Sequence, residues 1–247
     1  MFSPPLALAS LSGESDTEWA MAGREWAGAA FLGGIALDEP AREAARILVA
    51  RDRSEFLPND PVAFVDDQLA ALEDEPIQAA INVRAASADA LPPVARICRE
   101  RDAFLEINAH CRQPELCAVG CGETLLADTE RLRSYVDTAT EHGATVGVKV
   151  RAAVDDVNLP TLCRTLERAD ASFVHVDAMD SEAVIADIAG ACELYVIANN
   201  GVRDEATVRE YLEYGADAVS VGRPSDNPVV LERVRQALER WQQTRSP

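Results

Sequence analysis

Three cysteines and a histidine gather between residues 110 and 121. His110 and Cys111 are followed by Cys117 and Cys121, so the thiols have the spacing Cys-x5-Cys-x3-Cys. Zinc sites usually begin with two cysteines separated by two to four residues and need a matching second half, which this spacing does not provide. We therefore expect no metal here, and a single reactive thiol at the end of a strand is the simpler hypothesis.

Lys149 is the only lysine among the 23 cationic residues of the chain. It lies two residues before Arg151, so the alternation of a strand puts both side chains on one face. A buried lysine costs free energy unless an anion or an electron-rich ring meets its ammonium, whereas a solvated lysine at a strand end would carry no function. His175 lies on the apolar run 173–177, and such a lone histidine is more often a core residue than a ligand.

Glycines follow two further apolar runs, in Asn199-Asn200-Gly201 and in Gly222-Arg223. A glycine between a strand and a helix lets backbone N–H groups approach an anion at the helix N-terminus, and Arg223 adds a bidentate donor. The two junctions predict a phosphate site, although glycine turns after strands are also common for structural reasons.

The elements that position these residues are eight apolar runs of strand length, which alternate with segments of helical periodicity. We expect strands at Leu6–Ala9, Ala29–Leu37, Ile77–Val83, Phe104–Asn108, Thr145–Val150, Phe173–Val176, Leu194–Ala198 and Ala218–Val221. We expect helices to begin at the capping residues Asp38, Asp128, Asp180 and Asp204, an extra helix at Pro61–Leu72, and a last helix from Pro228 to about Thr244.

Strands that are apolar throughout, each followed by a helix, predict a parallel sheet buried on both faces. Eight such units close as an α/β (β/α)8 TIM barrel, which we expect to be a single domain over residues 1–247. A doubly wound open sheet is the alternative, but it normally shows a GxGxxG turn after its first strand, and this chain has none there. In a barrel the chemistry lies where strands end and helices begin.

The composition is that of a globular protein, with 48% hydrophobic residues and a net charge of -19. No stretch is long and apolar enough to span a membrane and the N-terminus lacks a basic leader, so we expect a cytoplasmic protein without a membrane partner. Its cysteines are expected as free thiols, with Cys98, Cys163 and Cys192 in the core. The acidic, lysine-poor surface suggests adaptation to high salt, in which charge alone does not decide whether the partner is a nucleic acid.

Taken together, the junctions resemble the dihydrouridine synthase family of FMN-dependent TIM barrels. Asn108 and Cys111 match the family's Asn-x-x-Cys, and Gly122–Leu126 matches the G-x-x-L-L element that follows it. Further matches are Lys149-Val150-Arg151 with K-I-R, Val196–Asn199 with V-I-A-N, and Gly215-Ala216-Asp217 followed by Gly222-Arg223 with G-A-D…G-R. His175 falls at the flavin-binding histidine, Asn82 stands where the family usually has a glutamine, and Ala9–Gly13 is a weak form of A-P-M-A-G.

The resemblance implies that reduced FMN, with NAD(P)H as the electron donor, delivers hydride to C6 of a uracil ring while Cys111 protonates C5. Lys149 would stabilise the anionic reduced flavin, and Asn108 and Arg151 would face the substrate. The remaining residues implied to bind FMN are Ser10, Leu11, Ser12, Asn82, His175, Asn199, Asn200, Gly201, Gly222 and Arg223.

The chain departs from the family pattern at three places. It has His110-Cys111-Arg112 in place of G-C-P, Val176–Asp180 in place of a basic run, and it stops after the eighth helix, where we expect the family's C-terminal helical tRNA-binding domain to be missing. A compact archaeal-type branch is the nearest match. The substrate expected is therefore tRNA or a free pyrimidine-like molecule, as in dihydroorotate dehydrogenase. A non-redox barrel that binds a phosphorylated metabolite is the alternative from another class. The sequence does not determine the oligomeric state.

Overall fold

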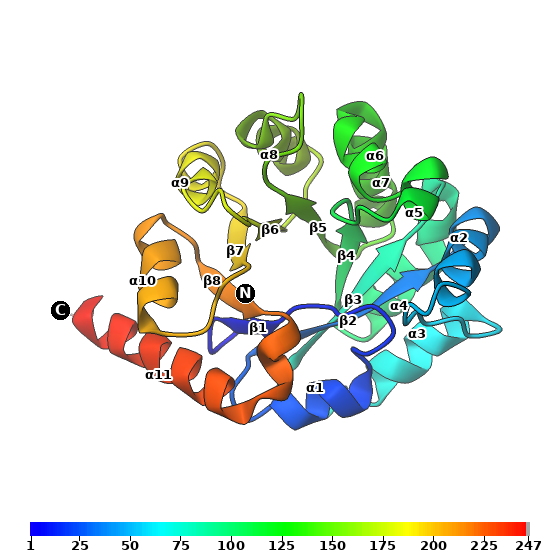
Figure 1. Cartoon of the computed structure of the whole chain (residues 1–247). Coiled ribbons are helices and arrows are strands. Elements are labelled where there is room, and N and C mark those ends of the chain that lie inside the picture. Colours follow the sequence, from blue (N-terminus) through cyan, green and yellow to red (C-terminus); the bar gives the residue numbers. More distant parts are fainter. Residues whose placement is uncertain (246–247) are drawn as a thin grey trace.

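Eight parallel strands close into a barrel surrounded by helices (Figure 1). The structure, a computed structural model, describes residues 1–245. The strands pair in sequence order, and β1 closes the ring against β8. They are β1 Leu6–Leu8, β2 Ala29–Ala36, β3 Gln78–Arg84, β4 Phe104–Asn108, β5 Thr145–Arg151, β6 Phe173–Asp177, β7 Tyr195–Asn199 and β8 Ala218–Val221. The predicted (β/α)8 TIM barrel is confirmed, and every strand ends within one residue of its expected limits.

The helices follow the strands as their capping residues dictate, with one exception. Asp38, Asp128 and Asp204 each accept a hydrogen bond from a backbone N–H in the first turn. Asp180 does not cap a helix, because the following helix begins only at Val184. The helices are α1 Thr17–Gly23, α2 Glu39–Val49, α3 Pro61–Ala70, α4 Leu91–Glu100, α5 Pro114–Ala118, α6 Glu123–Ala127, α7 Thr129–Glu141, α8 Leu159–Arg168, α9 Val184–Ala189, α10 Glu205–Glu213 and α11 Pro228–Arg245, with short 3-10 helices at Ala88–Ala90 and Arg223–Asp226.

Two helices lie between β2 and β3, and the additional one is α2. The helix expected at Pro61–Leu72 forms as α3, which packs on β3 and α4 like an ordinary helix of the barrel. By contrast, α2 packs against α5, in a small apolar cluster that includes Leu48, Leu116 and Cys121. Figure 1 shows α2 and α5 side by side at the rim. We therefore place the insertion at the α2 end of this segment.

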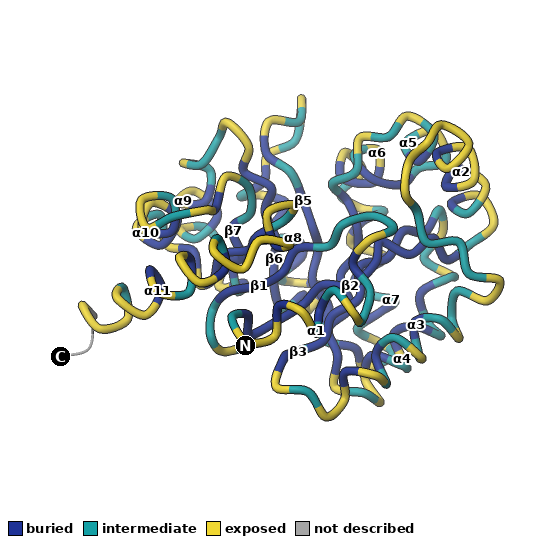
Figure 2. The backbone as a smooth tube through the Cα atoms, turned by 60° about the horizontal axis from the view of Figure 1, so that its bottom comes forward, coloured by how far each residue is buried: buried dark blue, intermediate teal, exposed yellow. Residues whose placement is uncertain are grey.

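The core has one layer between strands and helices and a second inside the barrel. Figure 2 shows the strands as a buried centre and the helices with exposed outer sides. Cys98, Cys163 and Cys192 lie in the outer layer as free thiols, as expected. Within residues 1–245, no helix combines the length and apolar character that crossing a membrane requires.

Apolar rings close the amino-terminal half of the barrel interior. Phe31 and Phe173 meet edge to face with centroids 5.7 Å apart, and Phe2 meets Tyr195 in the same way at 5.6 Å. A Cβ on Gly147 would lie 2.2 Å from the Phe173 ring, so only glycine leaves room for that ring. The layer comprises Ala7, Ala29, Phe31, Ala80, Phe104, Phe173, Ile197 and Ala218.

The inward-facing residues become polar towards the carboxyl ends of the strands. Along β4 the alternation runs from Phe104 to Glu106 and Asn108, and along β6 from Phe173 to His175. Asn82, Arg84, Lys149, Asp177 and Ser220 are further buried polar residues near these ends. Because a buried polar group must be paired, this half of the barrel predicts either an internal network or a bound ligand.

Candidate active site

A buried carboxylate and a buried imidazole pair in the middle of this polar half. Glu106 Oε1 lies 2.7 Å from His175 Nδ1, and neither side chain is exposed. A carboxylate only accepts, so the imidazole Nδ1 carries the proton, and Nε2 faces Ser220 Oγ at 2.8 Å. Burial lowers the pKa of His175, although Glu106 opposes it. Burial acts against the charge of Glu106, but His175 and Lys149 outweigh it and lower the pKa of that carboxyl.

Two asparagines extend this network to the loop that carries the cysteines. Asn82 Nδ2 donates to Glu106 at 2.6 Å, and Asn108 Nδ2 donates to Asn82 Oδ1 at 2.9 Å. Asn108 Oδ1 accepts the backbone N–H groups of His110 at 3.2 Å and Cys111 at 3.1 Å. Asn108 therefore fixes the start of the β4–α5 loop.

Lys149 lies beside this network without a partner of its own. Its side chain is only 2% exposed, yet no hydrogen bond or ion pair joins its ammonium to any of residues 1–245. Burial lowers the pKa of Lys149, against the opposing charges of Glu106 and Asp177. The ammonium keeps some accessible surface, so a ligand or water can reach it from the mouth.

His110 and Asp177 join two loops across the mouth. His110 Nε2 lies 3.1 Å from Asp177 Oδ2, and Asn200 Nδ2 donates to Asp177 Oδ1 at 2.8 Å. His110 Nδ1 is buried and has no partner among the described residues. The pKa of Asp177 is held well below its usual range, because these hydrogen bonds outweigh the effect of burial.

Cys111 is half-buried and packs against the apolar cluster of α2 and α5. Its carbonyl accepts the N–H of Glu123 at 3.0 Å and lies 3.4 Å from Cys117 Sγ. Gly122, with a φ of +59°, makes this return possible, since a Cβ there would lie 2.1 Å from the same carbonyl oxygen. Cys121 is buried, and burial raises its pKa to about 12, which leaves it a poor acid.

The β1–α1 loop reaches the mouth near Arg84. Arg84 forms a buried ion pair with Glu55 at 2.5 Å and donates to Ser12 Oγ, while its Nε has no partner within residues 1–245. Ser15 Oγ binds the backbone of Leu11 and lies 2.6 Å from the carbonyl oxygen of Gly33, which fixes the turn containing residues 10–12.

Arg151, from the end of β5, turns towards α6. Its Nη1 lies 2.9 Å from Glu123 Oε1, and its buried Nε has no partner among the described residues. Like the ammonium of Lys149, this N–H is left for a ligand or for water.

The two glycine junctions are open. A Cβ on Gly201 or on Gly222 would meet nothing within 4 Å, and neither N–H donates to another backbone group of residues 1–245. Arg223 is exposed beside them. The expected helix N-termini do not contribute: Gly222 precedes only a four-residue 3-10 helix, and Asp204 already caps α10. An anion here would be held by free backbone N–H groups and Arg223.

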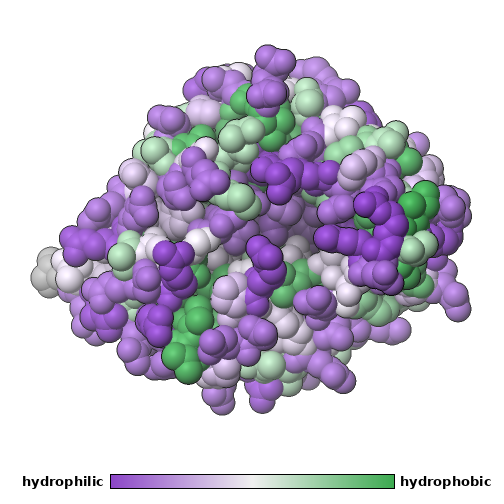
Figure 3. Space-filling view, in the orientation of Figure 1, coloured by the Kyte–Doolittle hydropathy of each residue, from purple (hydrophilic) through white to green (hydrophobic). Residues whose placement is uncertain are grey.

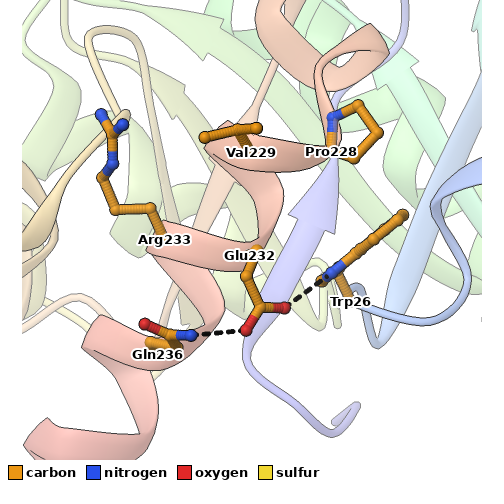
Figure 4. A pocket seen from close by; sticks show the side chains of 6 residues that line it. All are labelled: Trp26, Pro228, Val229, Glu232, Arg233 and Gln236. Atoms are coloured by element: carbon orange, nitrogen blue, oxygen red, sulfur yellow. Dashed lines mark hydrogen bonds between the residues drawn. The ribbon is translucent and has the colours of Figure 1, made fainter.

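Viewed in the orientation of Figure 1, the surface is hollowed at its centre, and mainly hydrophilic residues surround the hollow (Figure 3). A different pocket, of about 470 Å³, lies on the outside between Trp26 and α11 (Figure 4). There Glu232 accepts from Trp26 Nε1 at 2.9 Å and from Gln236 at 2.5 Å. Three of its polar side chains, Trp26, Glu232 and Gln236, satisfy one another, so we place no chemistry there.

Comparison with known proteins bears directly on this arrangement. A model of the family described as dihydrouridine synthase matches residues 62–247, which is more than half of the chain. The chain belongs to the dihydrouridine synthase family. Its members are FMN-dependent oxidoreductases, and we place the chain in that class of enzyme. An uncharacterised protein of Methanocaldococcus jannaschii is 26% identical over 232 residues, which cover 88% of each chain.

Solved structures share the fold at low identity. A DHODH of Eimeria tenella in complex with ferulenol is 15% identical, with a TM-score of 0.72 over 98% of this chain and 82% of that one. Morphinone reductase in complex with tetrahydroNAD is 12% identical, with a TM-score of 0.71 over 95% and 87%. The tryptophan synthase of Pyrococcus furiosus is 13% identical, with a TM-score of 0.58 over 97% and 98%.

The residues at the mouth suit the flavin of this family. The unpartnered ammonium of Lys149 and the open backbone at Gly201 and Gly222 are the features that an anionic ring and a phosphate would fill. The structure brings together the predicted residues Asn82, Asn108, His175 and Asn199 through hydrogen bonds that also involve Glu106 and Ser220. Lys149 lies on β5, in register with Asn108 on one side and His175 on the other. Sequence reasoning missed Glu106, Ser220 and the His110–Asp177 contact, although Glu106 shares the period-two face of Asn108.

Proposed function

We propose that the chain binds FMN beside Lys149 and reduces the C5=C6 bond of a uracil ring, with uridine in tRNA as substrate and NAD(P)H as electron donor. When bound, reduced FMN supplies a hydride for C6 of the ring. The observation that carries this proposal is Lys149 at the carboxyl end of β5, whose side chain is buried while its ammonium has no hydrogen bond or ion pair to any of residues 1–245. It lies between the Glu106–His175 pair and the mouth, where an anionic ring stabilises it.

The other residues proposed to bind FMN fall into two groups according to their position at the mouth. Gly201, Gly222 and Arg223 would hold the phosphate, because the space beside both glycines is open, neither N–H donates to the backbone of residues 1–245, and Arg223 is exposed. Further residues proposed to contact the cofactor are Ser10, Leu11, Ser12, Asn82, His175, Asn199 and Asn200. Of these, Ser12 bonds to Arg84, and Asn82 and His175 are fixed by Glu106, so their side chains are held in place before any ligand arrives.

Cys111 is proposed as the acid that gives a proton to C5, while Asn108 and Arg151 face the substrate. Asn108 holds the Cys111 backbone, and the unpaired Nε of Arg151 is available to a carbonyl oxygen of the ring. A thiol donates a proton only while it is protonated.

A second candidate substrate is a free pyrimidine-like molecule. Asp177 and Glu123 place two carboxylates close to the opening. These charges disfavour the approach of a polyanion at low salt, whereas a small pyrimidine with at most one negative charge is repelled far less. Both candidates use the same proposed flavin chemistry.

The test begins with flavin. The protein is purified and its absorbance recorded with FMN; a protein that binds no flavin would overturn the proposal and leave the non-redox phosphate-binding alternative. The reduced protein is then mixed anaerobically with unmodified tRNA or with uridine and orotate, in dilute and in molar KCl. Reoxidation of the flavin by tRNA supports the first substrate, and reoxidation by the small molecules alone supports the second.

A further inference from the structure

Hydrogen bonds across the mouth join the loop that carries Cys111 to the loop that carries Gly201. The chain of contacts runs from His110 Nε2 to Asp177 Oδ2 at 3.1 Å, and from Asp177 Oδ1 to Asn200 Nδ2 at 2.8 Å. His110 follows β4, Asp177 ends β6, and Asn200 follows β7. Because β5 lies between β4 and β6, the contact passes across the end of the strand that holds Lys149.

Each end of this chain is anchored to a residue with a proposed role. At one end, the Asn108 side chain accepts the N–H of both His110 and Cys111, so the two residues share one anchor. A displacement of His110 therefore displaces the Cys111 backbone, which Glu123 holds on its other side.

At the other end, Asn200 has a φ of +93°, a conformation that a non-glycine residue rarely adopts. It is retained because its side chain bonds to Asp177 and its carbonyl accepts from Tyr211 Oη at 2.9 Å. Asn200 directly precedes Gly201, so the same bonds orient the open N–H of that glycine.

The Asp177 carboxylate, at the centre of this chain of contacts, is suited to joining the two loops. Asp177 is only 7% exposed, and its two oxygens are divided between the two loops. The Asn200 amide and the imidazole both donate to it, and bonds to a charged acceptor are stronger than those between neutral groups. Removing the imidazole would leave Oδ2 without its donor, and removing the Asn200 amide would leave Oδ1 only the longer contact with the Met179 N–H at 3.4 Å.

We propose that His110, Asp177 and Asn200 are positioning residues that form a bridge between the glycine junction and the Cys111 loop, so that the geometry at Gly201 determines the placement of the Cys111 thiol. The inference rests on the proposed function for the role of Cys111. The bridge itself is a property of the ligand-free protein. Loss of any of its three members releases the same loop.

The experiment measures the rate at which iodoacetamide alkylates Cys111 in flavin-free protein, read for each cysteine by peptide mass spectrometry. His110→Ala, and equally Asn200→Ala on the distant loop, should raise the Cys111 rate by roughly threefold to tenfold, the range given by loss of one hydrogen bond. The double variant should react no faster than either single variant, because both break one bridge. His110→Gln, which keeps an N–H donor of similar reach, should stay near the wild-type rate.

His142→Ala is the matched control, since among residues 1–245 the His142 side chain bonds only to the Thr138 carbonyl of its own helix, and the substitution keeps the backbone carbonyl that accepts from Arg99. Cys98 is the internal control, because it is fully buried and reacts only if the fold opens. An Asn200→Ala variant with the wild-type Cys111 rate, or additive effects in the double variant, would overturn the proposal. Failure of the protein to bind FMN would instead remove the proposed function and leave this alkylation pattern as it is.

Discussion

Lys149, Glu106 and His175 show how individual residues determine the chemistry of this barrel. The Glu106 carboxylate is paired with an imidazole on one side and receives an amide on the other, so its buried charge is satisfied internally. Lys149 has no such partner among residues 1–245. The contrast indicates that the Glu106 carboxylate serves the internal network, whereas the Lys149 ammonium is available to a ligand.

Replacing Lys149 tests directly whether its ammonium contributes to FMN binding. Lys149→Met keeps most of the side-chain volume but removes the charge, and we expect FMN affinity to fall by roughly tenfold to a hundredfold, as for loss of one charged interaction. Quenching of FMN fluorescence on titration measures the affinity, and photoreduction tests the loaded protein. Full affinity with normal photoreduction in this variant, or in Lys149→Ala, would contradict the role.

The three cysteines of the β4–α5 loop are distinguished by single-turnover kinetics. Cys111→Ala should bind flavin normally but slow reoxidation of reduced FMN by substrate by a factor of about 10² to 10⁴, the usual contribution of a general acid. Cys117→Ala and Cys121→Ala should remain within a few-fold of wild type. A wild-type rate in Cys111→Ala, or a slow Cys121→Ala, would show that the acid is assigned to the wrong residue.

His175 predicts how stability depends on pH. Its folded pKa lies below that of the unfolded chain, which is about 6.5, so the unfolded state binds more protons and stability falls as the pH drops below that value. His110, whose pKa burial also lowers, adds a contribution of the same sign. Urea unfolding between about pH 7.5 and 5 should show a weaker dependence in His175→Gln. An unchanged slope in His175→Gln would contradict the assignment.

At the scale of elements, the strands place two kinds of glycine at different depths of the barrel. Gly147→Ala forces a Cβ to within 2.2 Å of the Phe173 ring, and overpacking of this kind typically costs about 1 to 3 kcal/mol of stability. Gly222→Ala meets nothing within 4 Å, so its unfolding free energy should stay near wild type while its FMN affinity falls. Chemical denaturation and FMN titration of both variants separate the two roles; loss of stability in Gly222→Ala would contradict them.

The elements themselves could be predicted because each strand is apolar along most of its length and is bounded by turn residues. The helix start at Asp180 was wrong, since a capping residue type does not ensure that a helix begins beside it. Asn82, Lys149 and His175 could be placed at the site through the resemblance. Glu106 and the contact between His110 and Asp177 could not, because they depend on which strands the closed ring brings opposite one another.

At the scale of the whole molecule, charge sets the conditions in which the fold is most stable. A net charge of -19 repels itself in dilute buffer, and molar KCl shortens the screening length to about 3 Å. We expect the melting temperature and FMN occupancy to rise between dilute buffer and molar KCl. A flat or falling melting temperature in that series would contradict the expectation.

The aromatic layer limits the routes by which ligands reach the inside of the barrel. Aromatic rings from β2, β4 and β6 close the amino-terminal end of the barrel, and Phe2 and Tyr195 pack against this layer. A ligand bound inside the barrel therefore enters and leaves only through the opening at the carboxyl ends of the strands. A reductant and a substrate that react at the same face of a cofactor must therefore bind one after the other. The first leaves before the second binds.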